Sequence, residues 1–226
     1  NLTDKIVKRS LPIKTTVSEV GPGPGCLTRS ILKQEPNIVF AIDKDIQSKK
    51  MLSDLKKIYN NKLEIIIDDA LHYPIWNLGT APRQIIANLP YNIGTKMLIS
   101  WLKHINQFNM MTLMFQKEVA DRIIAKPGSK QYGRLSILTN WLTKTNKVFD
   151  IPNTAFFPAP KVKSSVVQLI PYEKPLFDVK FESVEKITQM AFSQRRKMLK
   201  SSLKEINGKK ILADLSISPN LRPEDL

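Results

Sequence analysis

Gln84-Ile85-Ile86-Ala87-Asn88-Leu89-Pro90-Tyr91 is the stretch that decides the fold, because an apolar run ends abruptly in an amide, a proline and an aromatic ring. The run predicts a buried strand, and the residues after it predict a loop at its carboxyl end. The Asn88 side-chain oxygen, with backbone carbonyls held by Pro90, can accept both N–H bonds of a base's exocyclic amine, while Tyr91 stacks on the ring. The same residues also suit a plain strand-to-helix turn, so a second motif is needed.

That second motif is the glycine-rich run Glu19-Val20-Gly21-Pro22-Gly23-Pro24-Gly25, which follows the predicted strand Thr16–Val20 and precedes the amphipathic segment Leu27–Leu32. Glycines at alternate positions let a ligand approach the backbone closely. The dinucleotide-binding fingerprint needs a third glycine where Cys26 stands, which disfavours a pyrophosphate cradle. The acidic residue at the start of the run would repel phosphate, but it can hold an amine or a sulfonium.

Acidic residues follow two further apolar runs. Ile38–Ile42 ends in Asp43, where such folds hold ribose hydroxyls, and Leu63–Ile67 is followed by Asp68 and Asp69. With Glu19 and Asn88, these residues occupy the carboxyl ends of successive predicted strands. The sequence therefore predicts one cleft along that edge of a sheet.

The alternation of strand-like and helical periods from Thr16 to about Gln116 predicts an α/β fold with a mainly parallel, Rossmann-like sheet and helices on both faces. Met110–Phe115 is a fifth predicted strand, and Ser164–Ile170 is expected to close the sheet, ended by Pro171. Predicted helices include a short one at Leu2–Val7, then Glu118–Ile124 and Leu135–Phe149. Two helical stripes are expected in the core: Met51, Leu52, Leu55, Ile58 and Tyr59, and Met97, Leu98, Trp101, Leu102 and Ile105.

Composition points to a polyanionic partner. The 226 residues carry 35 lysines and arginines against 20 acidic residues, a formal charge of +15. A generally basic protein without such a partner is the alternative. The sequence shows no apolar run long enough for a membrane span, and its single cysteine, Cys26, cannot form an internal disulfide, so we expect a cytoplasmic protein. His72 and His104 have no cysteine or histidine cluster around them, so no metal is expected.

The sequence pattern changes after Pro175, where apolar residues recur at helical spacing without strand-like runs. This pattern predicts a small helical domain. The stripes consist of Val184, Ile187, Met190 and Ala191, and of Met198, Leu199 and Leu203. Seven basic residues against the single acid Glu205 lie between Ser193 and Lys210, which favours an RNA-backbone footprint over a merely solvated face. The loop Lys126–Arg134 suits phosphate contact and plain solvation equally.

These motifs together resemble the rRNA adenine N6-dimethyltransferases, a family of S-adenosylmethionine-dependent enzymes. Glu19–Gly25 with Cys26-Leu27-Thr28 resembles the family's cofactor loop, Asn88–Tyr91 with Asn92-Ile93 its catalytic motif, and Phe156–Val162 its target-base motif. Three further segments are typical of the bacterial small-subunit members: Gln116–Arg122, Gly128–Ser136 and Phe192–Leu199. The resemblance covers nearly the whole chain, in the family's order and spacing.

The resemblance implies a role for each matching residue. The expected catalytic residues are Asn88, Leu89, Pro90, Tyr91 and Phe156. S-adenosylmethionine is expected to contact Glu19, Gly21, Gly23, Gly25, Asp43, Lys44, Asp69, Ala70 and Asn88. RNA contacts are expected from Lys126, Lys130, Arg134, Lys161, Arg195, Arg196, Lys197 and Lys200. The family's Asp-Ala-Leu pattern favours Asp69 over Asp68, and the two remain alternatives.

By resemblance, the substrate is a pair of adjacent adenines in the 3′-terminal hairpin of small-subunit rRNA, dimethylated by a monomer on an immature subunit. We expect a catalytic domain over residues 1–175 and an RNA-binding helical domain over 176–226. The latter is expected to be incomplete, since Arg222–Leu226 resembles the opening of a further helical hairpin. Two alternatives stay open: a large-subunit rRNA methyltransferase of the macrolide-resistance type, and a non-catalytic nucleic-acid-binding factor of the same fold.

Overall fold

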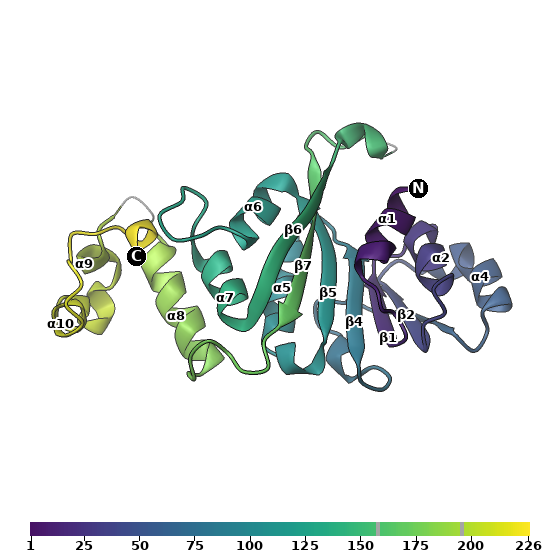
Figure 1. The fold of residues 1–226 in the computed structure, drawn as a ribbon, viewed down its shortest axis with the longest axis horizontal. Helices are drawn as coiled ribbons and strands as arrows, with labels where there is room; N and C mark the ends of the chain where they lie inside the picture. Colours follow the sequence, from purple (N-terminus) through teal and green to yellow (C-terminus); the bar gives the residue numbers. More distant parts are fainter. Residues whose placement is uncertain (157–158, 195–196) are drawn as a thin grey trace.

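The computed structural model describes residues 1–156, 159–194 and 197–226, and its core is a seven-stranded sheet in the order β3-β2-β1-β4-β5-β7-β6 (Figure 1). The strands are β1 (Thr16–Val20), β2 (Ile38–Asp43), β3 (Leu63–Ile67), β4 (Arg83–Asn88), β5 (Met110–Gln116), β6 (Thr143–Ile151) and β7 (Ser164–Pro171). The first five strands run parallel to one another, whereas β7 runs antiparallel to both β5 and β6. The predicted α/β sheet is confirmed.

Helices cover both faces of the sheet. They are α1 (Leu2–Arg9), α2 (Cys26–Leu32), α3 (Gln47–Met51), α4 (Ser53–Ile58), α5 (Gly94–Leu102), α6 (Lys117–Ile123) and α7 (Arg134–Leu142). In β4, Ile85 packs into the core cluster that contains Trp101 of α5, and its neighbour Ile86 packs into the cluster that contains Ile31 of α2. A strand buried on both faces reads as a continuous apolar run, which is why this stretch predicts the fold.

The carboxyl ends of the parallel strands are tied to one another by backbone hydrogen bonds. The Gly21 N–H donates to the Ile42 carbonyl at 2.9 Å, and the Asp68 N–H donates to the Asp43 carbonyl at 3.0 Å. Asn88 is in register with Met114 of β5. The loops that carry the predicted site residues therefore leave the sheet along one edge, as expected.

The predicted helix over Leu135–Phe149 is wrong in its second half. The helix ends at Leu142, and Thr143–Ile151 forms the edge strand β6, which pairs with β7 along its length. The segment Ser164–Pro171 is the last strand in the sequence, but it lies between β5 and β6 instead of closing the sheet. Pairing between distant segments decides both placements, and a local helical period does not report it.

The stripe expected at residues 51–59 is only partly buried. Leu52 and Leu55 are in the core, whereas Met51 is 45% and Ile58 73% exposed. The helix is interrupted at Leu52, between α3 and α4, so its apolar residues no longer share one face. The second stripe is confirmed by the buried side chains of Met97, Leu98, Trp101 and Leu102, with Ile105 packed against the same cluster in the 3-10 turn Ile105–Gln107.

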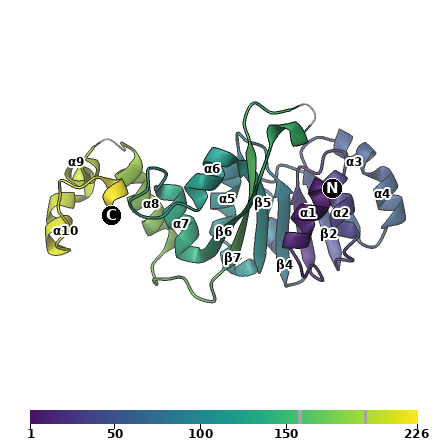
Figure 2. The same cartoon turned by 45° about the horizontal axis from the view of Figure 1, so that its top comes forward.

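The C-terminal part consists of α8 (Phe181–Phe192), α9 (Leu199–Ser202) and α10 (Gly208–Asp214), which lie at the opposite end of the molecule from α4 (Figure 2). Trp141 of α7 stacks on Phe177 and Phe181, with ring centroids 5.1 and 6.0 Å away, and so anchors the start of α8. A small cluster of Ala191, Leu199, Leu203 and Leu212 holds the last helices together. Two residues of the predicted stripes, Ile187 and Met198, are instead exposed.

The end of the chain contacts the loop between α6 and α7. The Gly128 N–H, in the loop between α6 and α7, donates to the Glu224 carbonyl at 3.2 Å. Within the described residues, no helix has the length and apolar character needed to cross a membrane.

Candidate active site

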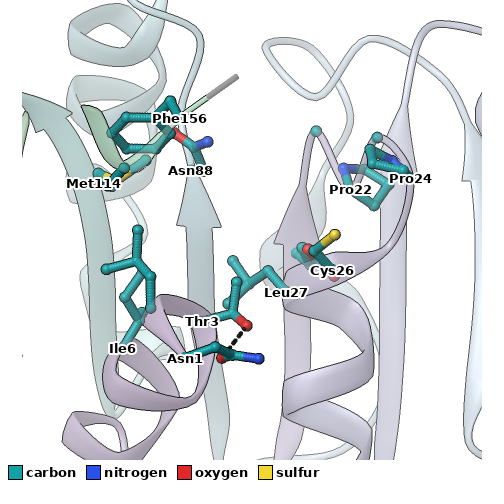
Figure 3. Close-up of a pocket in the computed structure, with 15 residues that line it drawn as sticks. Asn1, Thr3, Ile6, Pro22, Pro24, Cys26, Leu27, Asn88, Met114 and Phe156 are labelled. Atoms are coloured by element: carbon teal, nitrogen blue, oxygen red, sulfur yellow. Dashed lines mark hydrogen bonds between the residues drawn. The ribbon is translucent and has the colours of Figure 1, made fainter. Parts of the chain in front are cut away.

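A cavity of about 670 Å³ opens at the carboxyl ends of β1 and β4. Figure 3 shows Asn88, Met114 and Phe156 on one side, the loop with Pro22, Pro24 and Cys26 on the other, and Asn1, Thr3 and Ile6 of the first helix below. Glu19, Gly21 and Gly23 also line it. The cavity thus brings the glycine-rich loop and the catalytic motif together, as the sequence predicts.

The glycine-rich loop presents bare backbone to this cavity. Gly23 has φ of +51°, and a side chain added there would meet nothing within 4 Å, so the space beside its backbone is open. Left-handed backbone favours glycine, and open space allows a ligand to approach the main chain. The loop ends at Gly25, the N-cap of α2.

Glu19 is the buried polar group of the cavity. It is 1% exposed, and neither carboxylate oxygen has a hydrogen-bond partner among the described residues. Burial raises the pKa of Glu19 to about 8. The Thr28 hydroxyl and backbone N–H face the carboxyl and lower the pKa in part, although neither makes a hydrogen bond of normal geometry with it. A buried acid without a partner costs free energy, and a cation in the cavity would offset that cost.

A smaller hollow adjoins the cavity and is lined by Asn88, Leu89, Pro90, Tyr91 and Phe156, together with Gly21 and Pro160. Leu89 is buried and its N–H donates to the Met114 carbonyl at 3.3 Å, which anchors the loop. Asn88 is exposed, Tyr91 is 39% exposed, and the Tyr91 hydroxyl hydrogen-bonds the buried Ser164 hydroxyl at 2.9 Å. An amide and two aromatic rings around one hollow suit a flat base with an exocyclic amine.

Asn88 and Phe156 line both spaces. A ligand in the large cavity and a base in the small hollow would therefore meet beside the Asn88 side chain. This shared wall is the arrangement that group transfer between two bound molecules requires.

The acidic residues farther along the sheet edge lie outside the cavity lining. Asp43 accepts hydrogen bonds from the Asp45 N–H at 3.0 Å and the Ser48 hydroxyl at 2.6 Å, and so holds the start of α3. Asp69 accepts from the Leu71 N–H at 2.9 Å, and the exposed Asp68 from the Asp69 N–H at 2.7 Å. Lys44 is exposed and Ala70 buried. Asp68 and Asp69 remain alternatives for the predicted contact with the adenine of the cofactor.

Comparison with known proteins indicates the family to which this chain belongs and the reaction that the family catalyses. The family model of the ribosomal RNA adenine dimethylases matches residues 1–222. The chain belongs to that family. A Rhodospirillum rubrum protein named ribosomal RNA small subunit methyltransferase A is 44% identical over all of this chain and 79% of its own length.

Solved structures agree. A dimethyladenosine transferase from Plasmodium falciparum is 30% identical, with a TM-score of 0.77 over 99% of this chain and 83% of that one. The 23S rRNA methyltransferase ErmE has a TM-score of 0.73 at 22% identity, over 99% and 93% of the two chains, and at that identity it shows the fold alone. The fold, the family and the rRNA adenine dimethyltransferase activity are thus those expected from the sequence.

The basic residues predicted to contact RNA lie on loops beside the sheet and in the C-terminal helices of this rRNA adenine dimethylase. Lys126, Lys130 and Lys161 are exposed on loops, and Arg134 forms an ion pair with Glu185 at 2.8 Å. Lys197 and Lys200 line a separate hollow of about 530 Å³ in the C-terminal helices, together with Lys204 and Lys209. Arg195 and Arg196 lie outside the described residues, as do Phe157 and Pro158 of the target-base motif.

Two features of the site were missed from the sequence. Ser164, the partner of Tyr91, lies 73 residues from it, and no local pattern links them. The first helix was predicted, but its contribution of Asn1, Thr3 and Ile6 to the cavity wall was not.

Proposed function

We propose that this rRNA adenine dimethyltransferase transfers methyl groups from S-adenosylmethionine to N6 of two adjacent adenines in the 3′-terminal hairpin of small-subunit rRNA. The observation that carries the proposal is the wall of Asn88 and Phe156 shared by the large cavity and the smaller hollow. The name of the R. rubrum relative supports the small subunit as the target.

The cavity fits the proposed cofactor. S-adenosylmethionine supplies an electrophilic methyl group on a cationic sulfonium. The unpartnered Glu19 carboxyl suits a cationic ligand, and the open backbone at Gly23 suits close approach. Gly21 and Gly25 shape the same loop, with Asp43 and Lys44 assigned to the ribose end. Asp69 and Ala70 are assigned to the adenine end of the cofactor.

The chain's own residues hold the reacting amine. An adenine amine is a weak nucleophile because its lone pair is delocalised into the ring. Pro90 fixes the backbone of this loop. The Asn88 side-chain oxygen and the Leu89 carbonyl each accept a hydrogen bond from one N–H of the amine, which favours the pyramidal form of its nitrogen. Tyr91 and Phe156 sandwich the base, and their π faces stabilise the positive charge that develops on it. No strong general base is needed, since the nitrogen becomes acidic once alkylated.

The target base must leave its stack to enter the hollow, so an adenine in an RNA loop is favoured over a paired one. The charge of +15 supports a polyanionic partner. We assign catalysis to residues 1–175 and RNA binding to 176–226, with the loop residues Lys126, Lys130 and Lys161 adding phosphate contacts. A cytoplasmic monomer acting during assembly of the small subunit is part of the proposal.

The test is transfer of labelled methyl from S-adenosylmethionine to undermethylated small subunits, with large subunits and naked rRNA in parallel and the modified base identified by mass. Dimethyladenine in small subunits alone is the expected result. Label on large-subunit RNA would move the protein to the macrolide-resistance type. Absence of transfer to any of these RNAs would favour a nucleic-acid-binding factor.

Asn88→Ala sharpens the same test. This variant removes the proposed amide acceptor and is expected to lose transfer while it keeps most of its cofactor affinity, measured by calorimetry. Asn60→Ala is the matched control, since Asn60 is exposed in the turn that follows α4. Full activity of Asn88→Ala would contradict the assigned role.

A further inference from the structure

A further cavity, of about 350 Å³, lies between α5, α6, the start of α7 and the end of α8. It opens on the same edge of the sheet as the catalytic motif, because α5 begins at Gly94, just after that motif, and α6 follows the carboxyl end of β5. Figure 1 shows α6 and the loop after it on the side of the sheet where β6 ends. The cavity thus faces the side from which RNA would approach the site.

Its walls combine a flat ring, an amide and apolar surface. The half-buried Tyr132 ring is held edge-to-face against Phe192, with centroids 6.2 Å apart and planes at 78°. Gln131 is exposed and has no hydrogen-bond partner among the described residues, so its amide is available as donor and acceptor. Ile99 and Leu135 supply the apolar part of the wall. An aromatic face beside an amide is the chemistry that recognises an unpaired nucleobase.

The two arginines of the wall favour a base over a phosphate. Arg122 is paired with Glu118, and Arg134 is paired with Glu185 at 2.8 Å, a carboxylate that Lys103 shares at 3.1 Å. Both guanidinium groups therefore already have a carboxylate partner, with which a phosphate would have to compete. Among the described residues, the Arg134 Nε–H is buried without an acceptor, so this donor is turned away from the ligand space. The wall therefore suits an uncharged base edge better than a phosphate.

A line of hollows connects this cavity with the target-base hollow. Gln131 also lines a neighbouring hollow together with Lys117, Val162 and Lys163. Two residues before Val162, Pro160 lines the hollow of Tyr91 and Phe156. The acidic residues of this neighbouring hollow are paired, Glu118 with Arg122 and Asp121 with Lys117. An RNA strand that follows this line passes the exposed Lys163 on its way from one base-sized space to the other.

We propose that the cavity at Gln131 and Tyr132 binds a second unpaired nucleobase of the RNA whose target adenine enters the hollow at Asn88 and Tyr91. This inference rests on the proposed function, and it names a substrate contact beyond the reacting base. Two bases of one loop are held at two places, so the enzyme selects a loop by its geometry and not only by the presence of an adenine.

The test uses the 3′-terminal hairpin of small-subunit rRNA in versions that each carry one abasic loop position outside the target adenines. Dissociation constants are measured for the unaltered protein, Gln131→Ala, Tyr132→Leu and Tyr132→Phe. Gln34→Ala is the matched control, since Gln34 is exposed on the opposite edge of the sheet. Thermal unfolding identifies any variant that has lost its fold. If Tyr132→Leu does not fold, Gln131→Ala carries the test, because Gln131 is exposed.

One abasic position is expected to weaken binding about tenfold in the unaltered protein, in Gln34→Ala and in Tyr132→Phe, which keeps the ring. The same position should have an effect below about threefold in Gln131→Ala and Tyr132→Leu, because the contact is already gone. Equal abasic effects in all proteins would overturn the inference and leave methyl transfer to small subunits unaffected. Failure of the unaltered protein to bind or methylate any rRNA would overturn the proposed function as well.

Discussion

The Tyr91 hydroxyl and the Ser164 hydroxyl lie 2.9 Å apart and join the catalytic loop to the first residue of β7. Ser164 is fully buried between β5 and β6, in register with Gln116 and Ile151, whereas the Tyr91 ring is 39% exposed. A side chain that offers its ring to a ligand is thereby fixed at its far end to the rigid sheet. Side-chain order that is present before binding does not have to be gained during the reaction.

Ser164→Ala is therefore expected to lower kcat/KM for methyl transfer by about twofold to tenfold, the effect of one lost hydrogen bond. Tyr91→Phe should have a similar effect, and the double variant should be no worse than either single one, because both remove the same bond. Kinetics of the three variants on small subunits are the measurement.

Ser165→Ala is the matched control. Ser165 is equally buried, but its hydroxyl donates to Asp150 at 2.6 Å on the other face of the strand. Comparable loss of stability in both serine variants, with loss of kcat/KM confined to Ser164→Ala, would assign the effect to Tyr91. Additive effects of Ser164→Ala and Tyr91→Phe would contradict it.

The sequence predicts this site only where its residues are close along the chain or belong to a motif. Asn88, Leu89, Pro90 and Tyr91 are consecutive, and Phe156 was found through resemblance. No local sequence pattern predicts Ser164 as a site residue, just as none predicts strand β6. Thr143–Ile151 becomes a strand because β7 lies beside it, and that pairing depends on the whole sheet. Buried parallel strands, by contrast, form apolar runs, which is why the sequence predicts β2 to within one residue of its observed bounds.

Glu19 predicts a pH dependence of stability. Its pKa is about 8 in the folded protein, against an ordinary value of 4.5. Between these values the folded state keeps a proton that the unfolded state has released, so raising the pH favours unfolding. The penalty is absent below about pH 4.5 and complete above about pH 8, where it is on the order of 5 kcal/mol.

Glu19→Gln should remove this dependence, since the amide does not titrate. Urea unfolding between pH 5 and 9 is expected to show the variant gaining stability over the unaltered protein as the pH rises, whereas the exposed control Glu173→Gln should not. Above about pH 8, where Glu19 is ionised, the cofactor affinity of Glu19→Gln should fall, because a cation in the cavity loses its counter-charge. A constant difference in stability across the pH range would show that Glu19 does not titrate in this window.

Two glycines of the glycine-rich loop allow the cost of a steric clash to be compared with the cost of backbone strain alone. A Cβ at Gly25 would lie 2.6 Å from Leu52 Cδ2 and 2.9 Å from Leu55 Cδ1, on backbone with φ of +80°. Gly25→Ala is therefore expected to cost about 2–4 kcal/mol of stability. At Gly23 only the backbone strain remains, about 1–2 kcal/mol, but the new methyl group enters the cavity and should weaken cofactor binding about tenfold.

Gly128→Ala is the control for Gly23→Ala. Gly128 also has positive φ, at +77°, and open space around it, but it lies on the loop between α6 and α7. Calorimetry with S-adenosylmethionine, beside thermal unfolding, separates the two effects. Equal cofactor affinities of the two variants would mean that no ligand approaches the backbone at Gly23.

The C-terminal lysines predict how RNA affinity depends on salt. Lys197, Lys200, Lys204 and Lys209 surround one hollow, and no acidic side chain lines it among the described residues. Each phosphate contact changes the slope of log K against log salt by about 0.7–0.9. Lys204→Ala and Lys209→Ala should each reduce the slope by about that amount, and equally for every RNA sequence, because phosphates carry no sequence information.

Lys57→Ala is the control, since Lys57 is 77% exposed, pairs with Asp54 and lies on α4, at the opposite end of the molecule from α10 (Figure 2). An unchanged slope in Lys204→Ala and Lys209→Ala would show that the RNA does not reach this hollow, and would leave the loops beside the active site as its only proposed phosphate contacts.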